Sequence, residues 1–207
     1  MNKTTTNKMI TNLRDASATD RLADHVSRLL RRQEGIAIRP LVALCIGSDR
    51  YTGDALGPLV GSYLEERGAC LVYGSLDHPV HAGNLVETVN IVNARYLHPV
   101  IIAVDACLGR ASEIGNIEAW EGGIEAGIAV GNRLPSVGHI SLIGVVNAGG
   151  HLGYLDLQST PLAIVVKLSR AIGEALAIAL GRLAAQEAAA AVSRLSGGKA
   201  CPTLYRE

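Results

Sequence analysis

The sequence predicts an α/β protein, a three-layer sandwich in which helices cover both faces of a mostly parallel sheet of about five strands. Apolar runs of strand length alternate along the chain with segments whose apolar residues recur at helical spacing. The run LVALCIG at residues 41–47 is continuously apolar, which is typical of a strand covered on both faces. The chain has no Phe and one Trp, so its core must be built from Ala, Val, Ile and Leu.

The two outer helices are indicated by spacing and by their end residues. Residues 19–33 carry Leu22 and Val26 at helical spacing and end in arginines, where the helix dipole favours cations. Thr160 and Pro161 begin the last helix, because Thr is a preferred N-cap and Pro is favoured at the first helical position. This helix is expected to extend to about residue 186 or as far as 195. Between the two helices we expect strands at 41–47, 69–74, 99–106, 116–120 and 140–147 and helices at 56–67 and 84–95.

One domain is expected, since 207 residues suffice for a single core with extensions. Residues 1–18 are polar and are expected to form a flexible arm. Residues 19–196 form the α/β domain, with an N-terminal helix at 19–33 and a core at 40–186. Residues 197–207 are expected to be a tail.

Composition excludes several classes of function. Lys plus Arg and Asp plus Glu number 19 each, so the chain has no electrostatic footprint for nucleic acid or an anionic membrane. The N-terminus lacks the apolar region of a secretory signal, and charged residues interrupt the apolar stretch at 162–192. Four widely spaced cysteines without a C-x-x-C pair are typical of reduced thiols inside cells. We therefore expect a cytoplasmic protein that binds neither nucleic acid nor a membrane.

Polar loops follow three of the expected strands: GSDRYTGD follows the first, GSLDHPVHAGN the second and DACLGR the third. The carboxyl ends of parallel strands meet at one edge of a sheet, where ligands bind near the point at which the strand order reverses. We therefore expect one rim to gather seven side chains: Asp49, Asp54, Asp77, His78, His81, Asp105 and Arg110.

Asp54 and Asp105 are the candidate catalytic pair. Asp54 is equally compatible with a structural role as a helix N-cap or a first-turn carboxylate that accepts backbone N–H groups. Asp105 ends an apolar run, where an ionised carboxylate is costly unless it is paired or hydrogen-bonded. Two carboxylates held close together titrate unequally, so that one acts as an acid and the other as a base. Alternatively, the two share a divalent metal.

Histidines and a cysteine near the rim are weaker candidates. His78 and His81 suit a metal or proton-transfer role or the capping of their own loop, and His81 is the better placed to face the site. His139 immediately precedes an expected parallel strand, so it should lie at the opposite edge. Cys107 is best interpreted as a small buried hydrophobic residue.

Glycine-bearing loops at 127–135 and 147–153 permit close approach of a ligand to the backbone or serve as ordinary turns. Neither contains a phosphate-binding fingerprint. The predicted binding residues in and around the rim and these loops are Asp49, His81, Asn84, Arg110, Asn132 and Asn147.

Several motifs resemble those of a known family. The stretches LDHPVHAGNL, IIAVDACLGR, GNRLP and LPSVGHISLIGVVN resemble the YyaC-type sporulation proteins of spore-forming Firmicutes over residues 40–183. These proteins are relatives of the spore germination protease, which is similar in its Asp-Ala-Leu-Gly-Pro run and in an Asp-Ala after an apolar strand. The resemblance implies a phosphorylase/hydrolase-like fold shared with the hydrogenase maturation proteases.

The same resemblance implies an activity and a site. The two essential aspartates of the germination protease fall on Asp54 and Asp105, and the corresponding acidic positions of the maturation proteases contact nickel. Where the germination protease has a histidine in its glycine-bearing loop, this chain has Glu125.

Three functions follow from the resemblance. The first is a spore-associated peptidase that uses an aspartate pair and no cofactor, with peptides or small acid-soluble spore proteins as substrates. The second is a maturation protease dependent on a divalent metal such as nickel or zinc, and the third is a non-enzymatic sporulation factor. In each case we expect the protein in the cytoplasm of the sporulating cell or spore, with homodimerisation left open.

Overall fold

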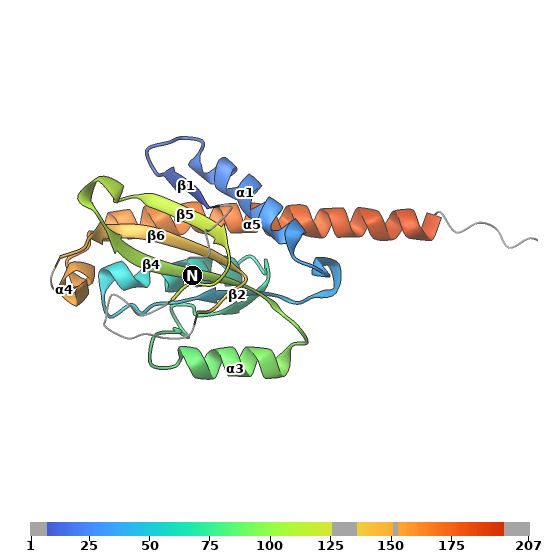
Figure 1. Ribbon diagram of the computed structural model, residues 1–207, viewed down its shortest axis with the longest axis horizontal. Coiled ribbons are helices and arrows are strands. Elements are labelled where there is room, and N and C mark those ends of the chain that lie inside the picture. Colours follow the sequence, from blue (N-terminus) through green and yellow to red (C-terminus); the bar gives the residue numbers. More distant parts are fainter. Residues whose placement is uncertain (1–7, 126–135, 151–152, 197–207) are drawn as a thin grey trace, which may run out of the picture.

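The computed structural model describes residues 8–125, 136–150 and 153–196 and confirms the predicted α/β fold (Figure 1). Its sheet has six strands in the order β1-β5-β6-β4-β2-β3. The β3, β2, β4 and β6 strands are mutually parallel, whereas β5 and β1 pair antiparallel at one side. The strands are β1 (Met9–Asn12), β2 (Leu41–Cys45), β3 (Leu71–Tyr73), β4 (Val100–Gly109), β5 (Asn116–Glu121) and β6 (Ile140–Ala148).

The expected flexible arm at 1–18 is wrong for Met9–Asn12, which form the edge strand β1. This strand pairs with β5, and its Thr11 is buried. A strand of four residues, two of them apolar, is too short to show a period, so its pairing depends on the edge of β5. Residues 1–7 and the expected tail at 197–207 lie outside the described residues.

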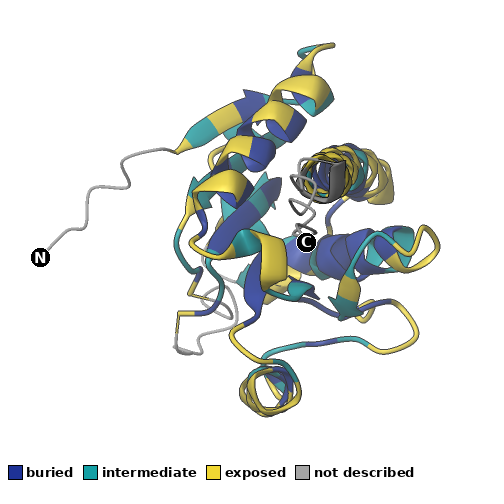
Figure 2. Ribbon diagram, turned by 90° about the vertical axis from the view of Figure 1, so that its right-hand side faces the viewer, coloured by how far each residue is buried: buried dark blue, intermediate teal, exposed yellow. Residues whose placement is uncertain are grey.

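Helices cover the sheet on both faces, and buried residues fill the space between the layers (Figure 2). The α1, α2 and α5 helices pack on one face, and α3 covers part of the other. Sequence periodicity missed the short α4, which contributes one buried side chain, Leu157. The helices are α1 (Ala18–Arg32), α2 (Leu56–Glu65), α3 (Leu85–Arg95), α4 (Gly153–Gln158) and α5 (Leu162–Ser196).

The strand order reverses beside β2, because the chain passes from β2 to β3 on one side and then crosses to β4 on the other. Two glycines, Gly47 and Gly57, allow the backbone to pack closely after β2. Gly47 has a φ of 141°, a left-handed value that favours glycine. A Cβ on Gly57 would stand 2.0 Å from the carbonyl oxygen of Ile46. This close packing brings the start of α2 against the carboxyl end of β2.

His139 lies at the opposite edge of the sheet, as the sequence predicts. Its Nδ1 accepts the backbone N–H of Ile101 at 3.0 Å, next to the first residue of β4. Arg39 also binds this end of the sheet, where it donates to the carbonyl oxygens of His98 and Pro99. His139 is therefore structural and is excluded from the candidate site.

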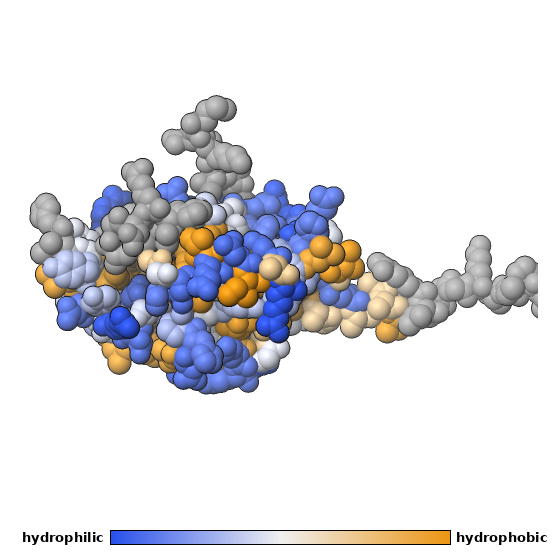
Figure 3. All heavy atoms as spheres, turned by 90° about the horizontal axis from the view of Figure 1, so that it is seen from below, coloured by the Kyte–Doolittle hydropathy of each residue, from blue (hydrophilic) through white to orange (hydrophobic). Residues whose placement is uncertain are grey.

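The helices in the described part of the chain include none that is both long enough and apolar enough to span a bilayer. The face on the α3 side, where grey atoms do not cover it, is mostly hydrophilic with separate apolar patches (Figure 3).

Candidate functional site

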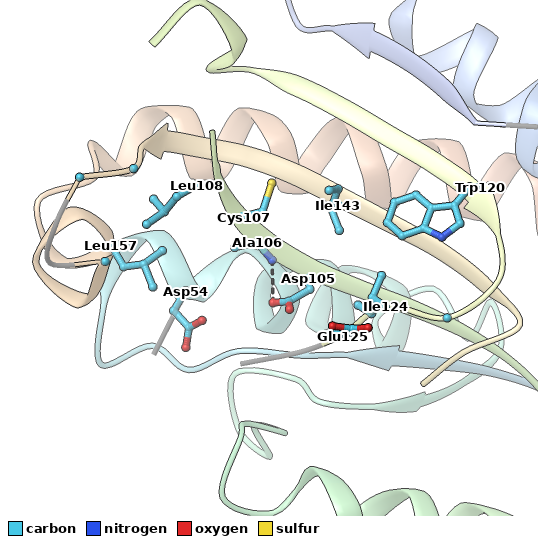
Figure 4. A pocket seen from close by; sticks show the side chains of 14 residues that line it. Asp54, Asp105, Ala106, Cys107, Leu108, Trp120, Ile124, Glu125, Ile143 and Leu157 are labelled. Carbon is cyan, nitrogen blue, oxygen red and sulfur yellow. Dashed lines mark hydrogen bonds between the residues drawn. The ribbon is translucent and has the colours of Figure 1, made fainter. Parts of the chain in front are cut away.

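A cavity of about 570 Å³ lies at the carboxyl ends of the central strands, beside the point where strand order reverses. Ligand sites of open α/β sheets form at this position. Both candidate aspartates line the cavity, and Figure 4 shows their carboxyl groups within it. The remaining lining residues are Ala106, Cys107, Leu108, Trp120, Gly123, Ile124, Glu125, Ile143, Gly149, Gly150, Gly153 and Leu157.

Asp54 reaches the cavity from the 3₁₀ turn Thr52–Ala55, which joins β2 to α2. Its backbone carbonyl accepts the N–H of Ser48 at 3.2 Å, which fixes the turn against the end of β2. The residue preceding α2 is Ala55, so Asp54 is not the N-cap of this helix. Asp54 is the acidic residue in the first turn of the 3₁₀ segment, which agrees with the first-turn form of the structural alternative. Burial raises the pKa of Asp54, while a backbone hydrogen bond from Ser48 and the charge of His81 partly offset the increase.

Asp105 lies within β4, where the alternation of side chains places it on the α3 face together with Ala103. Its Oδ1 accepts the backbone N–H of Ala106 at 2.8 Å. Burial and then the nearby charge of Asp54 raise the pKa of Asp105 well above its ordinary value. The strand therefore holds a carboxyl group that favours its protonated form.

His81 and Asn84 stabilise the loop before α3. Asn84 Oδ1 accepts the backbone N–H of His81 at 2.8 Å, and its Nδ2 donates to the Pro79 carbonyl at 3.1 Å. His81 Nδ1 accepts the N–H of Gly83 at 3.1 Å. Neither side chain lines the cavity, although His81 is close enough to affect the pKa of Asp54. The loop-capping alternative thus describes the contacts of both residues.

The other predicted binding residues lie outside the cavity or outside the described residues. Arg110 is paired with Glu113 at 2.7 Å and 84% exposed, so its guanidinium points to solvent. Asp49 is exposed. Asn147 Nδ2 donates to the Asp156 carbonyl at 2.9 Å and thereby holds α4 against β6. Asn132 falls outside the described residues.

The structure therefore brings together only two members of the predicted rim, since Asp77 and His78 are exposed residues outside the cavity. Asp54 reaches the cavity from the 3₁₀ turn before α2 and Asp105 from within β4, whereas Arg110 follows the end of β4.

Glu125 and Trp120 are cavity residues that reasoning about the rim did not include. Trp120 comes from β5, a strand antiparallel to its neighbours, so the rule for parallel strand ends does not apply to it. Glu125 follows Ile124, which forms an isolated bridge with Val137. The replacement of a histidine by glutamate within the family resemblance was the only signal for Glu125.

Cys107 lines the cavity but is a poor nucleophile, because burial, followed by the charges of Glu118 and Asp105, raises the pKa of its thiol to about 12. Its ordinary pKa is 9.0, so at pH 8 we expect alkylation by iodoacetamide to be about a thousandfold slower than that of a free thiol. Mass spectrometry of the labelled peptide measures this rate. Labelling as fast as that of free cysteine would contradict the assignment.

The described residues do not fit a metal centre, because no group of three or more His, Cys, Asp or Glu side chains among them has the arrangement of a metal-ligand set. Asp54, Asp105 and Glu125 share the cavity without converging on one point. The alternative of nickel or zinc at the aspartate pair therefore lacks a third ligand in this part of the chain, and no step is assigned to a metal.

The fold and cavity define an α/β protein with an acidic site at its topological switch point. Residues 10–175 match the family described as "Protein of unknown function (DUF1256)", and the chain belongs to this family. It is also similar to "Uncharacterized protein YyaC" of Bacillus subtilis (strain 168), with 37% identity over 185 residues, which are 88% of this chain and 89% of that protein. The similarity to the YyaC type is thus confirmed.

Proposed function

We propose that the protein is a peptidase in which Asp54 and Asp105 act as an acid–base pair. The observation that carries the proposal is the shared cavity: two carboxyl groups, 51 positions apart in the chain (105 minus 54), line one site, and the charge of one raises the pKa of the other. Such unequal carboxyl pairs are suited to general acid–base hydrolysis.

The two environments support an assignment of roles. Asp105 has its pKa raised well above the ordinary range and is the proton donor. Burial raises the pKa of Asp54 as well, but a backbone hydrogen bond from Ser48 and the charge of His81 partly offset this increase, so Asp54 is assigned as the base. Oxyanion stabilisation is assigned to neither His81 nor Arg110, because neither side chain lines the cavity.

The reaction consumes one water molecule. Asp54 takes a proton from the water as its oxygen attacks the carbonyl carbon of the peptide. Asp105 gives its proton to the amide nitrogen as the carbon–nitrogen bond breaks, and the products are a carboxylic acid and an amine. A proton passes from Asp54 to Asp105 through solvent and restores both groups.

The likeness to the germination protease supports peptides or small acid-soluble spore proteins as substrates, in the cytoplasm of the sporulating cell or spore. Nothing in the mechanism requires nucleic acid, a membrane or a cofactor. A homodimer is compatible with it but is not needed for the chemistry.

Cleavage of small acid-soluble spore proteins by the purified chain tests the proposal. We expect mass spectrometry to detect defined new termini with the wild type and none with Asp54→Asn or Asp105→Asn. Asp77→Asn, which changes an exposed aspartate outside the cavity, is the matched control. Absence of cleavage by the wild type, or equal cleavage by all four proteins, would overturn the proposal.

A non-enzymatic sporulation factor is the second candidate, and the shape of α5 favours it. This helix has 35 residues, or a length of about 52 Å. Leu183 is its last buried residue up to position 193, where the description of side chains ends. Its following part extends beyond the sheet (Figure 1) and exposes Val192. This part offers a surface for a partner protein. A sporulation phenotype that survives both aspartate changes but is lost on deletion of 184–196 would favour this candidate.

A further inference from the structure

Among the described residues, the cavity lining includes acidic and apolar side chains and no cationic one. Its three charged lining residues are Asp54, Asp105 and Glu125, and the other described lining residues are apolar, glycine or cysteine. Carboxylates that line a cavity attract cations and disfavour anions.

Glu125 is the only one of these three carboxylates that the proposed mechanism does not use. Among the described residues it has no hydrogen-bond or ion-pair partner, and it is exposed at the cavity wall. Asp105, by contrast, accepts the N–H of Ala106. Figure 4 shows Glu125 beside Ile124, on the Asp105 side of the cavity. It is therefore available to a group that enters from solvent.

Apolar side chains form the wall next to Glu125. Trp120, Ile124 and Ile143 line the cavity and belong to the apolar cluster on the α3 face. The Trp120 ring already lies 5.5 Å from the ammonium group of Lys8, a distance typical of a cation–π contact. Lys8 is ion-paired with Glu118, so it is not free to neutralise Glu125.

We propose that this cavity selects a lysine or arginine side chain of the peptide substrate and that Glu125 is the residue that determines this specificity. The inference rests on the proposed peptidase function and names its substrate class. The aliphatic stem packs against the apolar wall while the charged end pairs with Glu125, the usual arrangement for these two side chains. The cavity volume of about 570 Å³ lies within the range of small-ligand sites and leaves room for the peptide backbone at the aspartates.

The ion pair between Glu125 and a basic side chain should give a measurable preference for substrates with lysine or arginine. Charge-assisted hydrogen bonds in a partly enclosed site are strong enough for about a tenfold difference in affinity between a basic residue and an uncharged residue of similar length. The preference is expected to weaken as salt rises, because ions screen exposed charges.

Trp120 is the sole tryptophan of the chain and lines the cavity, so its fluorescence reports occupancy directly. The test uses the full chain with Asp105→Asn, which keeps position 105 uncharged and blocks turnover. The probes are capped tripeptides, acetyl-Ala-X-Ala-amide, in which X is Arg, Lys, norleucine or Glu. Calorimetry gives the same affinities independently.

We expect the Arg and Lys probes to bind about tenfold more tightly than norleucine and the Glu probe to bind most weakly. Adding Glu125→Gln should remove the preference, and Glu125→Lys should reverse it toward the Glu probe. Glu66→Gln at the far end of α2 is the matched control and should change nothing, since Glu66 is exposed and outside the cavity. Circular dichroism confirms that each variant is folded.

Equal binding of norleucine and the basic probes, no binding of any probe, or a preference that survives Glu125→Lys would overturn this inference. Different results would contradict the proposed peptidase function. Selective binding without cleavage by the wild type contradicts the peptidase and leaves the cationic specificity intact. Cleavage without a basic preference contradicts the specificity alone.

Discussion

Replacing Asp105 with asparagine is expected to raise the melting temperature at pH 7 while reducing peptide hydrolysis by about a hundredfold or more. The folded state raises the pKa of this carboxyl well above its ordinary 3.8. A group with a raised folded pKa contributes fully to stability below its unfolded pKa, and this contribution is lost as the pH rises through the folded pKa. Asparagine retains the size of the neutral acid but cannot ionise.

The stabilisation should therefore grow from about pH 4 upward and level off above the folded pKa. Each pKa unit of difference corresponds to about 1.4 kcal/mol, and each kcal/mol shifts the melting temperature by about 2–4 °C in a chain of this size. Calorimetry at several pH values measures the trend, with Asp77→Asn as the control. A stability difference that is the same at pH 4 and pH 7 would contradict a raised pKa of Asp105 in the folded state.

Replacing Gly57 with alanine is expected to destabilise the fold by about 3 kcal/mol or more, and thus to lower the melting temperature by on the order of 10 °C. The added Cβ would lie 2.0 Å from the Ile46 carbonyl oxygen and 2.7 Å from its backbone nitrogen. Both contacts are with backbone, which cannot move away by changing a rotamer. The start of α2 must therefore shift from β2, and Asp54 shifts with it.

Gly181→Ala in α5 is the matched control, because its Cβ would meet no atom within 4 Å. This change should stabilise the protein by about 0.5–1 kcal/mol, as alanine is the better helix former. Thermal unfolding of the two variants at one pH measures both effects. If the Gly57 and Gly181 variants behave alike, the close packing of α2 on β2 does not govern stability.

The aspartate pair was predictable because it depends on topology. The alternation of strands and helices implies a parallel sheet, and parallel strands place residues that follow them at one edge. Asp105 directly follows the apolar part of β4, and Asp54 lies in the turn that joins β2 to α2, so small errors in strand bounds did not change this prediction. Arg110 lies farther along, where its pairing with Glu113 directs it to solvent.

The positions of Glu125 and Trp120 in the cavity could not be predicted from the ends of parallel strands. Trp120 enters the cavity from an antiparallel strand, and Glu125 comes from a segment that pairs only through an isolated bridge. The hydrophobic periodicity of the surrounding segment does not predict that either side chain faces the cavity. Both depend on how β5 and the residues after it pack against β4 and β6.

Local sequence was sufficient for the class of fold, most element bounds and the meeting of two aspartates, because hydrophobic period and helix-terminal residues act within a few positions of the chain. The edge strand β1, the exclusion of Arg110 and His81 from the cavity and the acidic residues of its lining depended on contacts between distant segments. Such contacts form only when the layers pack, since the energy that selects them comes from burial and pairing across the sheet.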